Sequence, residues 1–470
     1  MRLFFLSWLL AGVLAQPAAL ADQGAALLPD QRADVPADLD RYTIVAQLDL
    51  AANTLTGTQE LAFVNQIRDG LDHIYLALYP NLPDIGGRTE VTAVQVDGRD
   101  AALIYEQRRY ALRVALPAPL ALGATADVTM RFTTRVPVDA ARRAYGAFNR
   151  EPMQINLATA YPILAPLRDG TWLSTAPSPK GDFVTSATAL YDVTLDAPAD
   201  WALATTGTQV ETRSADGRQI TRFVSGPQRE FAIVASRHQS ASVEVGGTRI
   251  TSYFRAEHAA GGQLALQVAA DALRVFNTQF GQYPFTELDV VEIGARKFYG
   301  VEYPGLIMID AGLYTGKNGE LTRTVAHEVG HQWWYGLVGN DTQREPWLDE
   351  GPTTYMQVVY FEGIGQPEAA ARELAQFRAD YRRIQGTAAD RPLRRSVLGL
   401  GRSYYTVAYA KGALFLQAVR EQVGDAAFYE GLRSYYRANR FGTGTTDELL
   451  TSFAQSCGCS IAKLAANWVG

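Results

Sequence analysis

Cysteine is scarce in this chain: among 470 residues only Cys457 and Cys459 occur. Two cysteines are too few for the disulfide framework that stabilises small secreted domains. Their C-x-C spacing leaves two alternatives open, a disulfide in an oxidising compartment or a reduced pair. No histidine or further cysteine lies near them in sequence to complete a metal site, so we expect no catalytic role for this pair.

An excess of positive charge is also missing. The 43 lysines and arginines stand against 49 aspartates and glutamates, which gives a formal charge of −6 at pH 7. Charges of both signs are mixed along the chain, so it lacks the electrostatic footprint of proteins that bind nucleic acid or anionic membranes. Low-complexity tracts are absent, and 47% of the residues are hydrophobic. We therefore expect two or three folded domains.

Long apolar runs are confined to the N-terminus. Residues 3–14 form an apolar stretch, and Ala19-Leu20-Ala21 follows as an A-x-A cleavage pattern. The pattern predicts a signal peptide over residues 1–21 and a mature chain that starts near Asp22. A membrane anchor is the weaker alternative, because the run is short and Gln16-Pro17 interrupts it. We expect an exported protein, periplasmic or secreted, that is soluble after the signal peptide is removed.

The sequence pattern changes near residue 255. Before it, short runs with period-two alternation, such as 42–50 and 126–132, are separated by turn dipeptides, which predicts a β-sandwich or twisted-sheet domain. After it, helical periodicity dominates, beginning with residues 263–280 and continuing to the end of the chain. The predicted fold class is α+β and multidomain. The predicted domains are residues 22–254, which are β-rich, and 255–470, which are mainly helical.

A short motif carries the chemistry of the second half. His327-Glu328-Val329-Gly330-His331 is an H-E-x-x-H sequence, and positions i and i+4 of a helix lie on one face, where two imidazoles can reach one metal ion. We expect this helix to span about 320–337, with an apolar stripe packed into the core. Two unrelated histidines on a helix are the alternative, and a third ligand at a sensible distance would decide between the two.

Glu350 supplies that third ligand. It follows His331 with 18 residues between them and lies in the segment Trp347-Leu-Asp-Glu-Gly351. The combined pattern resembles the gluzincin peptidases of the aminopeptidase N and leukotriene hydrolase family, whose usual wording in this segment is W-L-N-E-G.

Two further segments extend the resemblance. Residues 299–304 resemble the family's G-x-M-E-N sequence, with the glutamate kept as Glu302, the leading glycine displaced to Gly300 and the asparagine replaced by Tyr303. The sequence Tyr409-Ala-Lys-Gly412 resembles the family's Y-x-K-G. The resemblance implies a β-rich saddle or sandwich domain before a thermolysin-like catalytic domain, in a short form without the C-terminal helical domain of many members.

The resemblance also implies a ligand set and a mechanism. One Zn²⁺ per chain would be held by His327, His331 and Glu350, with Glu328 as the general base beside it. Tyr409 would stabilise the oxyanion, with Tyr404 and Tyr405 as neighbouring competitors in the sequence.

Substrate contacts follow from the same resemblance. Glu302 would bind the free α-amine of a peptide, and Gly300 would let the peptide backbone approach an edge strand. We expect a zinc aminopeptidase that acts on peptides. An endopeptidase or an epoxide hydrolase of the same fold, or an inactive peptide-binding protein, are the alternatives. Pro352 predicts that the second ligand helix starts near Glu350 or bends there, and His73, His238 and His258 are expected in surface or packing roles.

Overall fold

An eight-stranded sheet dominates the first half of the computed structural model, which describes residues 20–138, 145–295, 297–316 and 318–470. Its strand order is β16-β17-β14-β1-β2-β8-β4-β5, and all neighbours are antiparallel except β1 and β14. The bounds are β1 (Asp40–Asp49), β2 (Thr54–Val64), β4 (Arg88–Val96), β5 (Arg99–Asp100), β8 (Thr125–Arg135), β14 (Ala189–Pro198), β16 (Thr208–Ala215) and β17 (Arg218–Gln228). Buried and exposed residues alternate along β8, as the period-two pattern predicts.

Two four-stranded sheets and a two-stranded sheet of β12 (Leu167–Arg168) and β13 (Thr171–Trp172) complete the described part of the β-rich half. One four-stranded sheet has the order β11-β3-β7-β6 and packs its apolar face on the large sheet, and the other has the order β15-β18-β10-β9. Their bounds are β3 (Leu71–Ala77), β6 (Leu103–Glu106), β7 (Ala111–Leu120), β9 (Phe148–Glu151), β10 (Gln154–Leu157), β11 (Ile163–Leu164), β15 (Ala202–Thr205) and β18 (Ile233–Ser236). The turn at Asp97-Gly98 between β4 and β5 has positive φ at both residues, as a tight hairpin requires.

A five-stranded sheet with the order β19-β20-β21-β23-β22 forms the base of the second half. Its strands are β19 (Gln239–Val245), β20 (Thr248–Phe254), β21 (Glu287–Ile293), β22 (Gly300–Val301) and β23 (Leu306–Asp310). β20 pairs in parallel with β21, so this sheet contains residues from both sides of the predicted boundary at 254/255. The division into 22–254 and 255–470 stays a prediction.

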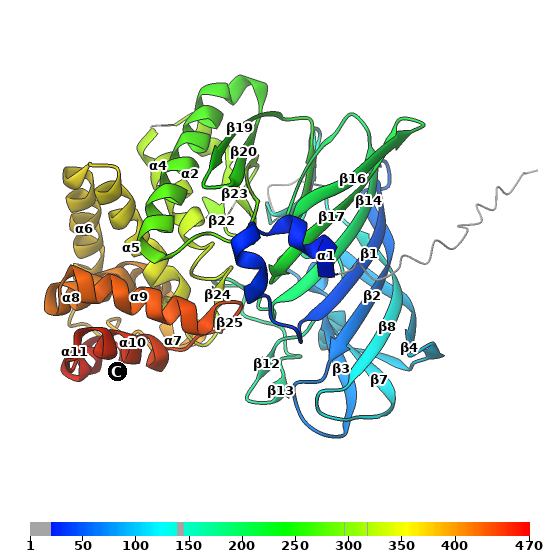
Figure 1. Ribbon diagram of the computed structural model, residues 1–470, viewed down its shortest axis with the longest axis horizontal. Coiled ribbons are helices and arrows are strands. Elements are labelled where there is room, and N and C mark those ends of the chain that lie inside the picture. Colours follow the sequence, from blue (N-terminus) through cyan, green and yellow to red (C-terminus); the bar gives the residue numbers. More distant parts are fainter. Residues whose placement is uncertain (1–19, 139–144, 296, 317) are drawn as a thin grey trace, which may run out of the picture.

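Helices form the rest of the second half, on the side of the molecule away from the large sheet (Figure 1). Their bounds are α2 (Ala259–Phe280), α3 (Ala311–Tyr314), α4 (Asn318–Gly330), α5 (Trp347–Gly363), α6 (Pro367–Arg382), α7 (Val397–Leu400), α8 (Gly412–Val423), α9 (Asp425–Asn439), α10 (Thr446–Cys457) and α11 (Ala462–Trp468), with a π-helix at Thr406–Lys411 before α8. The predicted α+β class, β-rich first and mainly helical second, is confirmed.

Strands β21 and β23 of the five-stranded sheet are buried on both faces, which explains why burial does not alternate along them. On one face Leu288 and Val290 of β21 join the core formed with the helices. On the other face Val291 and Ile293 pack against alanines of the β-rich half, among them Ala204 of β15 and Ala232. These small side chains let the two halves of the molecule approach closely.

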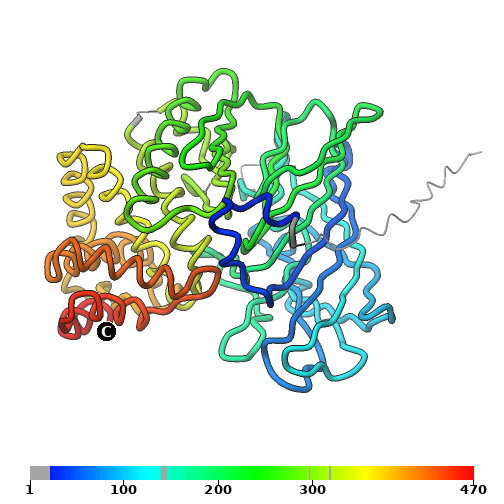
Figure 2. The backbone as a smooth tube through the Cα atoms, in the orientation of Figure 1, coloured from blue at the N-terminus to red at the C-terminus, as the bar shows by residue number. Residues whose placement is uncertain are grey.

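The first described segment connects the two halves. Blue in Figure 2, it runs from the large sheet to the helical half. Gln23 Nε2 donates to the carbonyl of Tyr191 in β14, and Leu28 N donates to the carbonyl of Pro284 ahead of β21. Residues 1–19, which contain most of the predicted signal peptide, lie outside the described residues. Within the described part of the chain, no helix combines the length and apolar character needed to cross a bilayer.

Candidate metal centre and active site

Helix α4 carries the first two candidate ligands. Leu321, Val325 and Val329 are at most 1% exposed and hold one side of the helix in the core, as predicted. The expectation that the helix continues to residue 337 is wrong, because α4 ends at Gly330 and the chain then turns. His331 N still donates to the His327 carbonyl at 3.2 Å, so the one-turn spacing of the two imidazoles is kept.

A polar contact to the Nδ1 atom orients each of the two imidazoles. His331 Nδ1 donates to the Trp334 carbonyl at 3.1 Å, which directs Nε2 towards His327 and Glu350. His327 Nδ1 lies 3.2 Å from the side-chain amide of Gln357. The two Nε2 atoms face each other at 3.1 Å. Such a contact to the ring nitrogen that would not bind the metal is typical of metal-ligating histidines.

Glu350, in the first turn of α5, is the third candidate ligand. Its Oε2 lies 3.4 Å from His327 Nε2 and 3.6 Å from His331 Nε2, and it is buried without a hydrogen-bond partner. Burial raises the pKa of Glu350, but the two imidazoles outweigh burial and lower the pKa to about 2. Two imidazole nitrogens and a carboxylate converging on one point are the donor set of a catalytic zinc site, so these residues fit the metal. Pro352 lies inside α5, which begins at Trp347.

Two more carboxylates flank His331. Glu302 follows the edge strand β22, and ligand atoms of Glu302, Glu328 and His331 all lie within 4.8 Å of one another. Both glutamates are buried, and Glu328 Oε2 has no hydrogen-bond partner. A Cβ on Gly300 would lie 2.3 Å from Glu328 Oε1. Glycine at 300 is therefore needed to leave space for the Glu328 carboxylate.

Burial and neighbouring carboxylates shift the pKa values of Glu302, Glu328 and His331. Burial, with Asp182 as the next cause, raises the pKa of Glu302 to about 8. Burial also raises the pKa of Glu328 well above its usual range. For His331 burial disfavours the imidazolium form, but the surrounding carboxylates, led by Glu302, raise its pKa well above the usual value. In the protein without metal, burial therefore favours the neutral forms of Glu302 and Glu328.

Tyr409 contacts the ligand set from the π-helix. Its hydroxyl donates a short hydrogen bond to Glu350 Oε1, and its ring stacks on His327 with centroids 6.0 Å apart. Tyr404 is buried, and its hydroxyl has no hydrogen-bond partner. Tyr405 is 60% exposed. Of the three tyrosines, Tyr409 alone has a described hydrogen bond to a candidate ligand.

Sequence reasoning missed two carboxylates. Asp182 comes from the β-rich half, in the loop before β14, and Asp349 precedes Glu350. Oxygens of Asp182, Asp349 and Glu350 lie within 4.8 Å of one another. Burial, with Glu350 and Asp349 as further causes, raises the pKa of Asp182 well above its usual range. No local pattern marks Asp182, since only tertiary structure brings its loop to the helices.

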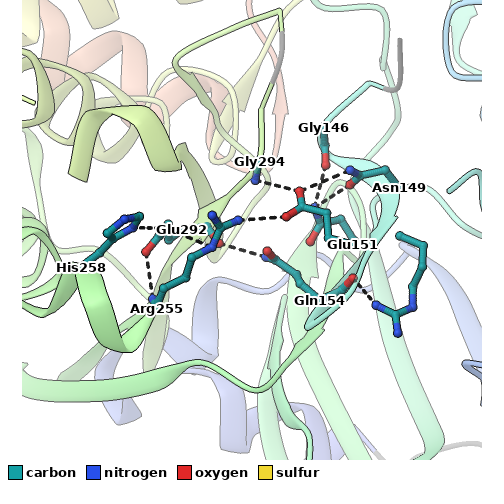
Figure 3. Close-up of polar contacts among 10 residues, drawn as sticks. Gly146, Asn149, Glu151, Gln154, Arg255, His258, Glu292 and Gly294 are labelled. Carbon is teal, nitrogen blue, oxygen red and sulfur yellow. Dashed lines mark hydrogen bonds and ion pairs between the residues drawn. The ribbon is translucent and has the colours of Figure 1, made fainter. Parts of the chain in front are cut away.

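A partly buried polar cluster fixes the chain just ahead of β22 (Figure 3). Glu151 of β9 accepts from Gly294 N at 3.1 Å and pairs with Arg255 at 2.9 Å. Glu292, which is fully buried, pairs with Arg255 and with His258 Nδ1 at 2.6 Å. The cluster therefore ties the β-rich half to the end of β21, a few residues before Gly300 and Glu302.

The structure brings together every site residue that the sequence singled out: His327, Glu328, His331 and Glu350 at the centre, Tyr409 on one side, and Gly300 with Glu302 on the other. The remaining three histidines lie elsewhere: His73 contacts Asp72, His258 contacts Glu292, and His238 lies between β18 and β19. Cys457 and Cys459 form a disulfide.

Residues 264–468 match the peptidase family M1 domain. Among curated relatives, aminopeptidase 2 of Candida albicans is 24% identical over 309 residues, which cover 60% of this chain and 32% of that protein. Aminopeptidase M1 of Arabidopsis thaliana is 23% identical, with 60% of this chain and 34% of that protein covered. The chain thus spans about a third of the length of these relatives.

Solved structures share the fold over nearly the whole chain. The M1 zinc metallopeptidase of Deinococcus radiodurans superposes with a TM-score of 0.69 at 23% identity, covering 91% of this chain and 92% of that one. A mutant of the same protein bound to a Tyr-Ser-Ala substrate gives a TM-score of 0.70 at 23% identity, with 92% and 94% covered. Residues 264–468 thus resemble a peptidase family M1 domain, within a chain that shares the fold of these solved metallopeptidases.

Proposed function

We propose that the protein is a zinc-dependent metallopeptidase, and specifically an aminopeptidase that removes the first residue of peptides. The observation that carries the proposal is the convergence of His327 Nε2, His331 Nε2 and Glu350 Oε2 beside the buried carboxylate of Glu328. The M1 domain match and the aminopeptidase relatives support the same activity.

One Zn²⁺ would be held by His327, His331 and Glu350. When bound, it supplies a Lewis acid that polarises a carbonyl and lowers the pKa of water. Glu328, buried with a free oxygen, accepts the proton of the attacking water and delivers it to the leaving amine. Tyr409 donates its hydroxyl hydrogen bond to the developing oxyanion after leaving Glu350.

The excess of carboxylates favours a substrate with a free α-ammonium group. Five acidic side chains lie in or beside the candidate centre: Asp182, Glu302, Glu328, Asp349 and Glu350. Glu302, at the edge strand, is the carboxylate that we assign to the α-amine. Gly300 lets the peptide backbone approach the same strand.

We further propose export through residues 1–21, with a mature chain that begins near Asp22 and acts in the periplasm or outside the cell. The packing of Gln23 against β14 supports a folded chain from about that point. Residues 22–254 and 255–470 would act as the N-terminal and catalytic domains.

The central test joins metal content with activity. The purified protein is expected to bind one zinc per chain and to hydrolyse aminoacyl 4-nitroanilides. Glu328→Gln should keep the zinc but lose at least about 10³-fold in kcat, because the proton acceptor is gone. Wild-type protein without stoichiometric zinc would refute the proposal.

Exopeptidase action has a separate test. A peptide with a free N-terminus is compared with its N-acetylated form, which carries no positive charge for Glu302. We expect cleavage of the free peptide and at least about 100-fold slower cleavage of the acetylated one. Equal rates would instead support the endopeptidase alternative.

A further inference from the structure

Two glycines meet where α5 crosses the segment that carries Tyr409. Gly351 directly follows Glu350 in α5, and Gly412 is the first residue of α8. A Cβ on Gly412 would lie 2.8 Å from the Gly351 Cα, and a Cβ on Gly351 would lie 3.1 Å from the Gly412 Cα. The obstacle on each side is backbone, which cannot rotate away as a side chain can. Side chains at these two positions would therefore force the two segments apart.

The same contact extends along the π-helix at Thr406–Lys411. Gly412 N donates to a carbonyl five residues earlier, which is the hydrogen-bond pattern of a π-helix. A Cβ on Gly351 would also lie 3.3 Å from the Ala408 carbonyl oxygen. The backbone of α5 thus contacts the π-helical turn just before Tyr409 and again just after it. Such turns are rare and recur at functional sites.

The backbone contact and the side-chain contacts of Tyr409 belong to one crossing. The Tyr409 hydroxyl donates a short hydrogen bond to Glu350 Oε1, and its ring stacks on His327 with centroids 6.0 Å apart. Glu350 and Gly351 are consecutive, and two residues separate Tyr409 from Gly412. A change in the distance between the glycines is therefore transmitted to the hydroxyl, and a displacement of about 1 Å can cost 10²-fold in rate.

A second contact holds the end of the π-helix. Lys411 is 4% exposed, and its Nζ donates to Asp390 Oδ1 at 2.7 Å and to the Arg391 carbonyl at 2.8 Å. Asp390 Oδ2 accepts from the hydroxyl of Tyr381, near the end of α6, at 3.0 Å. Because this end of the π-helix is tied to α6 and to the loop after it, its distance from α5 is set locally, at the glycine contact.

We propose that Gly412 is a positioning residue: its contact with Gly351 sets how far the Tyr409 hydroxyl reaches into the candidate metal centre. The inference rests on the proposed function, in which Tyr409 donates to the oxyanion. In Gly412→Ala the added methyl group overlaps backbone, so the π-helix moves away from α5 and carries the tyrosine with it. The effect of Gly412 on catalysis passes through the hydroxyl of Tyr409.

A double-mutant cycle with Tyr409→Phe separates positioning from general damage. The zinc-loaded full chain is assayed with the aminoacyl 4-nitroanilide that wild type cleaves fastest. We expect Gly412→Ala to lower kcat by about 10–100-fold and to keep KM within about three-fold, because a displaced hydroxyl no longer meets the oxyanion. In the Tyr409→Phe background the same change should lower kcat by no more than about two-fold. An equal loss in both backgrounds would overturn the proposal.

Urea unfolding of the metal-free protein gives a readout that does not depend on turnover. Tyr409→Phe removes the hydrogen bond to Glu350 and should lower the free energy of unfolding. In Gly412→Ala that bond is already lost, so Tyr409→Phe should lower this free energy by less than half as much. Equal decreases would show that Gly412 does not position the hydroxyl. If zinc-loaded wild type cleaves no aminoacyl 4-nitroanilide, the proposed function fails, whereas the unfolding cycle still tests the position of Tyr409.

Two further glycine variants complete the experiment. Gly351→Ala introduces a milder overlap on the facing side of the contact, so it tests the proposal by the same two cycles if Gly412→Ala does not fold. Additive effects of Gly351→Ala and Tyr409→Phe in both cycles would contradict the proposal. Gly261→Ala is the matched control, since its Cβ would lie 2.5 Å from the Tyr314 carbonyl oxygen, a backbone overlap between α2 and α3. Its effects on kcat and on unfolding should be equal in the two backgrounds.

Discussion

Tyr409 is the residue whose contacts link the candidate ligand set to the rest of the site. Its hydroxyl donates to Glu350, and its ring stacks on His327, so it contacts two of the three candidate ligands. Tyr404 is buried without a described hydrogen bond, and Tyr405 is largely exposed. The site therefore distinguishes three tyrosines that the sequence leaves within six positions of one another.

We expect Tyr409→Phe to lower kcat by about 10²–10³, because a donor to the oxyanion is lost, which corresponds to about 2.7–4 kcal/mol. Zinc content at saturating metal should stay near one per chain, since the ligands are intact. Single-turnover rates and metal analysis measure the two effects separately. Tyr405→Phe is the matched control and should stay near wild-type rate. Loss of activity in Tyr404→Phe with retention in Tyr409→Phe would reassign the role.

At the scale of single residues, the sequence predicted which side chains converge where their spacing along the chain sets their positions in space. His327 and His331 are one helical turn apart, and Glu350 lies in a recognisable segment, so their convergence could be predicted. Asp182 could not be predicted, because its loop reaches the site through tertiary packing, and no periodicity or motif marks it. Glu302 was partly predictable. The motif around it departs from the family's wording, but the glutamate itself is present and directly follows the edge strand β22.

Among the secondary-structure elements, the long periodic ones were the most predictable. The expected helix at 263–280 corresponds to α2, and the expected segment from 347 to 361 corresponds to α5. The end of α4 was not predictable, because the sequence continues with apolar residues. Trp333 and Trp334 instead turn back, with both of their N–H groups donating to the Gly330 carbonyl. Tertiary burial of the two indoles overrides helix periodicity there.

The junction between β18 and β19 carries a pH-dependent contribution to stability. Burial, with Arg255 as a further cause, lowers the pKa of His238 from 6.5 to about 4. Glu257 and His258 also face it. Because the unfolded chain binds a proton on this histidine near pH 6.5 and the folded chain does not, this contribution is present above about pH 6.5. It is lost as pH falls towards 4.

The size of this contribution is at most about 3 kcal/mol. Urea unfolding of wild type and His238→Gln is compared from pH 7.5 to 4, with a chelator present so that metal release does not add protons. The free energy of unfolding of wild type should fall more steeply than that of the variant between pH 6.5 and 4. Parallel curves over this interval would contradict the assignment.

At the scale of the whole molecule, two kinds of contact join the halves. One is the buried side chain of Arg229, and the other is the packing of small alanine side chains against β21. Arg229, between β17 and β18, is 3% exposed. Its Nε donates to the Tyr335 carbonyl at 2.7 Å, its Nη1 donates to the Ser186 carbonyl at 2.8 Å, and its Nη2 forms a short bond to the Gly442 carbonyl. A Cβ on Gly339 would overlap the guanidinium. One arginine thus connects the β-rich half to the loops behind the candidate metal helix.

Arg229→Met should therefore destabilise the molecule far more than an ordinary surface change. The methionine fills part of the space, but it leaves three carbonyls, in two halves of the chain, without their donor, and unsatisfied buried acceptors cost about 1–3 kcal/mol each. We expect the free energy of unfolding to fall by about 3–5 kcal/mol, measured by urea titration with tryptophan fluorescence. Arg237→Met is the matched control: its partner Asp200 is exposed, and such a pair is worth about 1 kcal/mol or less. Equal losses in the two variants would mean that Arg229 does not hold the halves together, and that the alanine-rich interface does so alone.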